Sequence, residues 1–344
     1  MRFFLIFVIG IVSLQVSFGQ EGQKKDSGLS YRIVFYNVEN FFDPYVDSTK
    51  SYNEFTPEGN LHWTYNKYVK KRNDVYKTLT AIGEWKPLTI VGFAEVENFL
   101  VLYELIKKTP LKYEHYKIVH YESEDFRGID VGVIYNADLF HLLSSSKIKI
   151  RSEQDTAFKT RDIIYLKGLL GTDTLHVFFN HWTSRYRGML ESEAYRMLAA
   201  ETLMKVTDSV CRVDPGANIL IMGDFNDNPE NESLQHLVHD TVCHLSHLTF
   251  TNTNKDVNGT LKHHASWSYF DQAIVSGPLI SAKNGLRVAD GLVHVFDTDF
   301  LLTKDEKYLG LKTYRTNIGF KYNGGISDHL PVYVDILSRS SDHE

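Results

Sequence analysis

Six short polar clusters, spread through the chain, carry side chains suited to phosphoester chemistry. Carboxylate and amide oxygens are the ligands that Mg²⁺ prefers in proteins, and a histidine held near a carboxylate can transfer protons. Together such groups suit a hard divalent cation and a phosphate ester. The residues are Asn37 in YNVENFF, Glu95 in GFAEVEN, His181 in NHWTSR, Asp224 and Asn226 in GDFNDNP, Asp271 in FDQAIVS, and Asp328 and His329 in SDHLPV.

Nearly every cluster adjoins an apolar, β-branched run, which is typical of a buried strand. RIVFYN ends at Asn37, TIVGFAE ends at Glu95, and LHVFFNH ends at His181. Strand ends are rigid, and the loops that leave them can bring polar groups from distant parts of a chain to one point. The pattern therefore predicts one composite site.

Asn37 and Glu95 together make a reasonable partial shell for Mg²⁺, which keeps several waters and takes one or two protein carboxylates. The alternative is structural: an Asn that ends a strand and a Glu in an ion pair. In GDFNDNP, Asp224 could orient or deprotonate a water, and Asn226 could donate to a phosphoryl oxygen. We expect Gly223 to allow a sharp backbone turn after the strand. Turn chemistry alone is the alternative for this motif.

A carboxylate beside His329 would fix its tautomer and raise its basicity. Asp271 is the natural candidate for that carboxylate. His181 is followed closely by Arg185, which favours a cationic contact with phosphate over a capped core histidine. Trp267 could stack on a base or a sugar, but we favour packing in the core as the explanation for an aromatic at this position.

Composition limits the function classes. The 344 residues are 43% hydrophobic and 23% charged, as in an ordinary globular protein. The formal net charge is −6, whereas a sequence-independent grip on a long polyanion usually needs a basic face. The only compact basic run outside the N-terminal tail is KKR at 70–72, which we interpret as a solvated helix face. This balance weighs modestly against tight nucleic-acid binding without excluding its turnover.

The N-terminus has the pattern of a secretory signal peptide over 1–19, with Arg2 before an apolar run and small residues before the expected cleavage point. A buried N-terminal strand is the alternative. A polar tail over 20–30 follows. No other stretch approaches the ~20 apolar residues of a transmembrane helix, so we expect a secreted or periplasmic protein without stable membrane insertion. Cys211 and Cys243 could form a disulfide or remain two buried thiols.

Strand and helix patterns alternate without a linker, which indicates one α/β domain over 31–338, with two packed sheets and helices outside. We expect helices over 66–85, 98–108, 189–210 and 230–238, and strands over 31–37, 89–94, 116–121, 131–135, 147–151, 163–170, 174–180, 217–222, 269–276 and 332–337.

In this order the motifs resemble the endonuclease/exonuclease/phosphatase superfamily, whose fold is that of DNase I, over nearly the whole chain after the signal peptide. The strings NVENFFD, RGIDVGVIY, NHWTSR, GDFND and SDHLPV are closest to its exported branch of predicted nucleases. The resemblance implies a four-layered α/β sandwich of two mixed β-sheets flanked by helices. It also implies phosphoester hydrolysis by an activated water, with Mg²⁺ or Mn²⁺ as cofactor.

The resemblance also implies roles for individual residues. Glu95 would be the main metal ligand, with Asn37 and Asp328 completing the shell. Asp224 would orient the attacking water, Asn226 would stabilise the transition state, and His329 with Asp271 would act on the phosphate or the water. His181 matches a second acid, and Arg127, with Asp130, matches a motif that either sets the local conformation or positions phosphate. Arg127 is therefore an expected substrate contact, together with Arg185 and Trp267, which the sequence itself indicates.

These features predict an exported, metal-dependent phosphodiesterase whose partner is a phosphoester, most simply nucleic acid, with no protein partner expected. One alternative is a phosphatase or phosphodiesterase acting on small-molecule or lipid phosphoesters, since relatives use such substrates. Another is a binding protein that retains the fold without activity. The segment 281–325 is a long insertion relative to compact repair nucleases, which leaves the substrate open.

Overall fold

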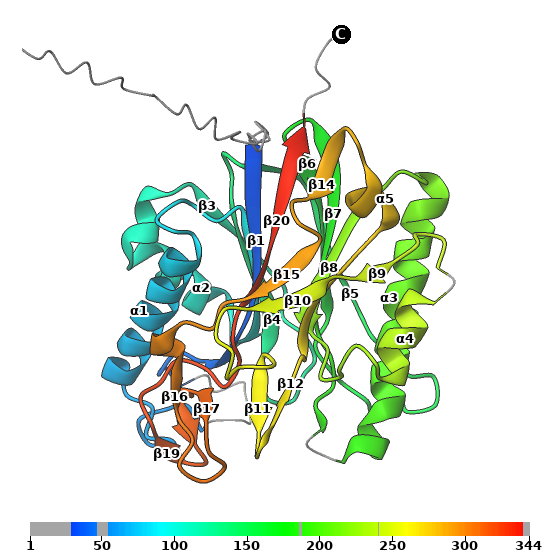
Figure 1. The fold of residues 1–344 in the computed structure, drawn as a ribbon. Coiled ribbons are helices and arrows are strands. Elements are labelled where there is room, and N and C mark those ends of the chain that lie inside the picture. Colours follow the sequence, from blue (N-terminus) through cyan, green and yellow to red (C-terminus); the bar gives the residue numbers. More distant parts are fainter. Residues whose placement is uncertain (1–28, 47–53, 186–187, 240, 340–344) are drawn as a thin grey trace, which may run out of the picture.

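The computed structural model describes residues 29–46, 54–185, 188–239 and 241–339. Two large β-sheets pack face to face, and helices cover the outer face of each (Figure 1). This arrangement confirms the predicted four-layered α/β sandwich. The predicted signal peptide over 1–19 and most of the polar tail over 20–30 lie outside the described residues. Strand β1 begins at Leu29, two residues before the expected start of the first strand.

The first sheet contains eight strands, and β1 lies near its centre. β1 pairs in parallel with β2 and antiparallel with β20, which returns from the C-terminal end of the chain. The strand order is β10 (Thr249–Asn252), β15 (Leu292–Val295), β20 (Val332–Arg339), β1 (Leu29–Phe41), β2 (Ile90–Val96), β4 (Asp130–Asn136) and β3 (Tyr116–His120), and β14 (Gly285–Val288) pairs with β20.

The second sheet contains six strands, with the parallel pair β7 and β8 at its centre. Its edge strand β5 begins and ends earlier than the predicted strand over 147–151, because a serine-rich stretch conceals the alternation of an exposed edge. The strand order is β5 (Phe140–Ile148), β6 (Ile163–Leu170), β7 (Asp173–His181), β8 (Asn218–Asp224), β13 (Asp271–Val275) and β9 (Ser246–His247).

The helices and small hairpins complete the domain. α1 and α2 lie on one side of the sandwich, and α3 and α4 lie on the other (Figure 1). No helix in the described ranges is long and apolar enough to cross a membrane. The helices are α1 (Tyr65–Ile82), α2 (Phe99–Lys107), α3 (Met189–Val213), α4 (Glu232–Val238) and α5 (Gly277–Ser281), with 3₁₀ turns at Pro110–Tyr113 and Asp299–Leu301. The hairpins pair β11 (Leu261–His263) with β12 (Ser266–Ser268), β16 (Leu302–Lys304) with β17 (Leu311–Thr313), and β18 (Asn317–Ile318) with β19 (Lys321–Tyr322).

The core between the sheets is tightly packed at the strands that lead to the predicted site. Phe35 of β1 stacks on Phe179 of β7 with ring centroids 6.3 Å apart. A Cβ at Gly92 of β2 would lie 2.2 Å from a carbon of the same Phe179 ring, so only glycine fits there. This close contact fixes the spacing of the two sheets and hence of the side chains at their ends.

Gly223 has a different role from the expected one. It lies within β8 rather than in a turn after it, and its backbone φ is not in the left-handed region. A Cβ at this position would lie 2.5 Å from the carbonyl oxygen of Asn180 on β7. The glycine is therefore required because the two central strands approach closely just before Asp224.

The basic run KKR in α1 is not the solvated face that we expected. Lys71 and Arg72 are buried. The Lys71 ammonium donates to the backbone oxygen of Glu39 and to the hydroxyl of Thr316, and Arg72 pairs with Glu104 at 3.1 Å. The insertion that contains Thr316 packs over this face of the helix, which sequence spacing within α1 does not reveal.

Cys211 in α3 and Cys243 form a disulfide, with Cα atoms 5.5 Å apart and a sequence separation of 32. We expect the double substitution of both cysteines by alanine to lower the free energy of unfolding by about 3–4 kcal/mol, because the bond closes a loop of this length in the unfolded chain. Urea denaturation monitored by circular dichroism measures the change. Free thiols in the unreduced, denatured protein would contradict the bond itself.

Candidate active site

The strand registers bring the predicted residues to one end of both sheets. His181 on β7 lies opposite Asp224 on β8, and Asp224 lies opposite Asp271 on β13. In the other sheet Asn37 on β1 pairs with Ala94, the residue before Glu95 on β2. The side chains of the two sheets meet directly, because Asn37 Nδ2 donates to Asp224 Oδ2 at 2.9 Å.

Asp224 lies at the centre of these contacts and is almost completely buried. Its Oδ1 accepts the backbone N–H of Asn226 at 3.0 Å. Its Oδ2 lies 3.6 Å from His181 Nε2 and 3.8 Å from His329 Nε2. Burial raises the pKa of Asp224 to about 7, and the positive charge of His329 opposes that rise. The carboxyl group can therefore hold or release a proton near neutral pH.

Asp271 and His329 form the expected pair. His329 Nδ1 lies 2.7 Å from Asp271 Oδ2, and both residues are buried. Burial alone would lower the pKa of His329, but the charges of Asp271 and Asp224 outweigh it and raise that pKa well above its usual value. His329 is therefore an imidazolium that faces Asp224 with Nε2.

His181 has the opposite charge state. Burial, and then the positive charges of Arg161 and Arg127, lower its pKa well below the usual value. Its Nδ1 has no hydrogen-bond partner in the part of the chain that the structure describes. A neutral histidine and a charged histidine thus flank the same carboxylate, an arrangement by which one site can supply different acid–base functions.

Two of the predicted site residues have strained backbones. Glu95 has φ = +63° and Asn226 has φ = +53°. Residues other than glycine rarely adopt this left-handed backbone conformation. The Asn226 amide donates to the backbone oxygen of Trp182 at 3.1 Å, which ties the loop after β8 to the loop after β7. Such strain persists where the surroundings enforce it, often at functional sites.

The three predicted metal ligands have separate hydrogen-bond and ion-pair partners. Glu95 Oε2 accepts the backbone N–H of Asn40 at 2.9 Å. Asn37 Oδ1 accepts the N–H of Glu39 at 3.0 Å, and Asp328 pairs with Arg315 at 3.0 Å. The ligand atoms that all lie within 4.8 Å of one another at this site are instead those of Asp224, Asp271 and His329.

Glu39 is an acid that sequence reasoning missed, although it lies two residues after Asn37 in the same motif. Its buried carboxylate accepts the N–H of Thr316 at 2.6 Å and lies 3.0 Å from Arg315. Burial and the charge of Asp328 raise the pKa of Glu39 to about 7, although Arg315 and Lys71 oppose the rise. Negative charge is therefore crowded here. Since the donors are carboxylate and amide oxygens, this part of the site fits a hard divalent cation.

The predicted substrate residues occupy different positions. Arg127 reaches the site, with Nη1 3.9 Å from Glu95 Oε1. Arg185 instead holds the loop after β8, since it pairs with Asp227 at 2.6 Å and donates to the backbone oxygen of Asn226 at 2.7 Å. Trp267 is partly buried on β12 and packs against the main core.

Asp130 supports the loop that carries Arg127 and does not reach the site itself. Its Oδ1 accepts the backbone N–H of Ser123 at 2.8 Å, and its Oδ2 lies 3.0 Å from His120 Nε2. Arg161, which sequence reasoning did not select, pairs with Asp125 in this loop at 3.0 Å. It also donates to the Trp182 carbonyl, so the loop is tied to the site.

Among solved structures, the chain is similar to an endonuclease/exonuclease/phosphatase family protein from Bacteroides thetaiotaomicron, with a TM-score of 0.55, 14% identity, and coverage of 90% of this chain and 98% of that chain. It is similar to a mannosyl-6-phosphatase from the same organism, with a TM-score of 0.55, 14% identity, and coverage of 89% and 99%. It is also similar to truncated TDP2 from Caenorhabditis elegans, with a TM-score of 0.53, 14% identity, and coverage of 90% and 98%. At these identities the likeness shows the fold.

No curated protein sequence matches the chain. The profile of the Endonuclease/Exonuclease/phosphatase family, in contrast, matches residues 32–338, which include every predicted site residue. The chain therefore belongs to the Endonuclease/Exonuclease/phosphatase family.

Proposed function

We propose that this protein is an exported, divalent-metal-dependent phosphodiesterase that hydrolyses nucleic acid. The observation that carries the proposal is the set of contacts around Asp224: a carboxyl with a pKa of about 7, a neutral His181 on one side, and a cationic His329 on the other. Export rests on the signal-peptide pattern of residues 1–19.

In this proposal Asp224 orients and deprotonates the attacking water. Its second oxygen is held by Asn37 at 2.9 Å, so the carboxylate keeps one orientation. The imidazolium of His329, held by Asp271, stabilises the negative charge that develops on the phosphoryl oxygens. One N–H of the Asn226 amide donates to the Trp182 carbonyl, and we assign the other to a phosphoryl oxygen.

His181 has a more limited role than the second acid that the resemblance implied. As a neutral imidazole it can donate one hydrogen bond and accept another. It has no acidic proton to give at neutral pH until an anionic phosphate binds beside it and raises its pKa. We therefore assign it to hydrogen bonding with the phosphate, and to proton donation only in the substrate complex.

Glu95, Asn37 and Asp328 would hold Mg²⁺ or Mn²⁺, and Glu39 adds negative charge behind them. The ion supplies Lewis-acid stabilisation of the phosphoryl group, worth several kcal/mol. Arg127, 3.9 Å from Glu95, is placed to contact the same phosphate. Arg185 supports the loop that carries Asn226, and any contact that it makes with substrate would come in addition to that role.

Nucleic acid is the preferred substrate because the site adjoins a cleft whose wall combines aromatic rings with three cations, Arg127, Lys159 and Arg161, beside four acids. Among structures with this fold, TDP2 from D. rerio was solved with a single-strand DNA product. A small phosphoester is the second candidate, since the net charge of −6 suits a small anion better than a long polyanion.

Hydrolysis of plasmid DNA and of bis-p-nitrophenyl phosphate, each with Mg²⁺, with Mn²⁺ and with EDTA, tests the proposal. We expect plasmid nicking and turnover of the small diester with either metal. With EDTA both rates should fall by roughly 10²-fold or more, because the metal contributes several kcal/mol of stabilisation. Turnover of the small diester alone would move the substrate to a small phosphoester. Activity that persists in EDTA would contradict metal dependence.

A further inference from the structure

A cavity of about 800 Å³ opens beside the candidate active site. Arg127 and Arg161 line it, and both belong to the site's surroundings: Arg127 lies 3.9 Å from Glu95, and Arg161 donates to the Trp182 carbonyl. Thr183, two residues after His181, is also in its wall. A group attached to a phosphate at Asp224 would therefore extend into this cavity.

Aromatic rings form part of its wall. The Phe158 ring stacks on Tyr195 of α3 with centroids 4.0 Å apart and planes 8° apart. The Tyr195 hydroxyl donates to Asp155 at 2.8 Å, which holds this pair in place. Phe126 lines the same cavity and is 65% exposed, so its ring is accessible to a ligand. Such rings are surfaces on which an unpaired base can stack.

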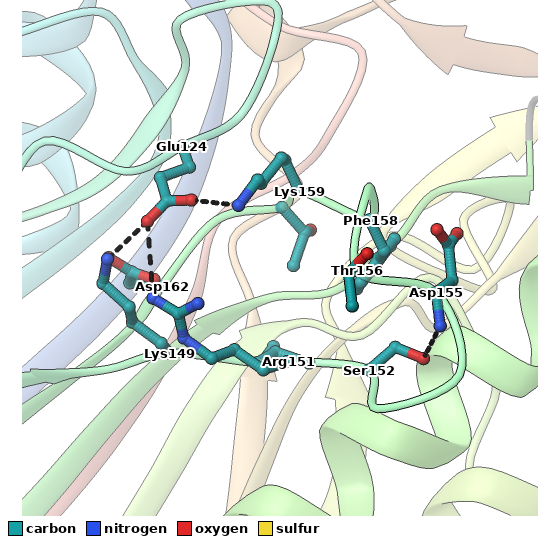
Figure 2. Close-up of a pocket in the computed structure, with 11 residues that line it drawn as sticks. Glu124, Lys149, Arg151, Ser152, Asp155, Thr156, Phe158, Lys159 and Asp162 are labelled. Atoms are coloured by element: carbon teal, nitrogen blue, oxygen red, sulfur yellow. Dashed lines mark hydrogen bonds and ion pairs between the residues drawn. The ribbon is translucent and has the colours of Figure 1, made fainter.

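Three cationic side chains converge around a single carboxylate, Glu124, which itself lines the cavity. Figure 2 shows Glu124 joined to Lys149, Arg151 and Lys159. The distances to the Glu124 oxygens are 2.5 Å, 3.6 Å and 2.6 Å, respectively. These cations line a second cavity of about 100 Å³, which shares five residues with the first: Glu124, Asp155, Phe158, Lys159 and Thr160. The two cavities therefore form one groove.

The cationic end of the groove has an excess of positive charge. The neighbouring acids Asp125 and Asp162 have their own partners, Arg161 at 3.0 Å and Lys147 at 3.1 Å. Asp155 also lines both cavities, and its carboxylate accepts the Tyr195 hydroxyl at 2.8 Å. Glu124 is the carboxylate that has described ion pairs with the three converging cations, and all four of these side chains are at least a third exposed. Glu124 and Asp155 together leave one of the three positive charges unmatched. In a chain with a net charge of −6 this is a local site for an anion.

We propose that this groove binds a single strand of nucleic acid. An unpaired base of the strand stacks against Phe126 and Phe158. A neighbouring phosphate binds Lys149, Arg151 and Lys159 and displaces the Glu124 carboxylate from them. The inference rests on the proposed phosphodiesterase function of the adjacent site. A base in a duplex is already stacked and paired, so only a single strand can use the aromatic wall without flipping a base. A small phosphoester with one phosphate has no neighbouring phosphate to place on these cations.

The test is fluorescence anisotropy with a labelled oligothymidylate of about twelve nucleotides in EDTA, which measures binding without turnover. We expect the double substitution Lys149→Ala, Lys159→Ala to weaken binding about tenfold and to reduce the salt dependence by roughly one to two charges. Phe126→Ala should weaken binding about fivefold or more through lost stacking. Glu124→Gln should tighten it about fivefold, because the competing anion is removed.

Lys107→Ala is the matched control. Lys107 is exposed on α2, which lies on the opposite side of the sandwich from α3, the helix that carries Tyr195 of the groove. Thermal melting of every variant establishes that the fold is retained. Unchanged affinity in the lysine pair and in Phe126→Ala, or weaker binding in Glu124→Gln, would overturn the assignment. Equal loss of duplex binding in Phe126→Ala would overturn the preference for a single strand. Failure of the proposed function would show differently, as a wild-type protein that hydrolyses no phosphodiester with Mg²⁺.

Discussion

We expect Asp224→Asn to lower kcat for phosphodiester hydrolysis by about 10³-fold, because an amide cannot accept the proton of the attacking water. General acid–base catalysis contributes on the order of 10²–10⁴-fold. The substitution keeps the size of the side chain. It also leaves an oxygen to accept the Asn226 N–H, which Asp224 holds at 3.0 Å. The loss should therefore appear in kcat rather than in the fold.

Thermal stability distinguishes this chemical effect from unfolding. The raised pKa of Asp224 means that the folded protein disfavours its charged form. At a pH above the ordinary pKa of a carboxyl, Asp224 therefore lowers the free energy of unfolding, and a neutral amide at this position removes that penalty. Against this gain, the N–H₂ group of the introduced amide would face the donor of Asn37. We expect little net change in melting temperature. Asp256→Asn, at an exposed loop position, is the control. Full activity in Asp224→Asn would refute the role of this carboxyl.

His329→Ala should lower kcat by about 10²–10⁴-fold, because it removes the imidazolium that faces Asp224 and the phosphoryl group. The side chain is buried beside Asp271 at 2.7 Å. Its removal leaves a charged Asp271 without that partner, so some loss of stability is also expected. Asp271→Asn therefore provides a second measurement, since it keeps the volume and alters only the charge beside the histidine.

The pH dependence of kcat/KM in Asp271→Asn tests the coupling. Asp271 helps to raise the pKa of His329, so His329 stays protonated as the pH rises through neutrality. If the imidazolium is the active form, activity falls when the pH passes that pKa. Without the Asp271 charge the pKa is lower, and the alkaline limb of the profile should move to lower pH. His264→Ala, at an exposed histidine, is the control. An unmoved alkaline limb would separate His329 from the chemistry.

The residues of the site could be selected from the sequence because each one marks the end of a local pattern. Asn37, Glu95, His181 and Asp224 follow apolar runs that form β1, β2, β7 and β8. The hydrophobic period and the residue composition of a segment are properties of a few neighbouring residues. They therefore identify a strand and the polar group at its end without knowledge of the rest of the chain. The fold class followed from the same alternation of strands and helices.

The charge states of the site residues depended on the tertiary structure. His181 and His329 are the same residue type, yet burial and nearby arginines keep one neutral, whereas two carboxylates keep the other charged. Asn37 and Asp224 are 187 residues apart in sequence and meet only because the two sheets pack together. A pKa depends on the solvent and charges within a few ångströms, and sequence spacing does not specify those.

Several contacts near the site likewise follow from packing between distant segments. Lys71 reads as a surface residue within α1, but it is buried by the insertion that carries Thr316 and Arg315. Glu39 becomes part of an acidic cluster only when that insertion and Asp328 surround it. The sequence identified which residues have suitable chemistry, because that property is local. Only the tertiary structure decided their partners, burial and protonation, because those depend on segments that meet through folding.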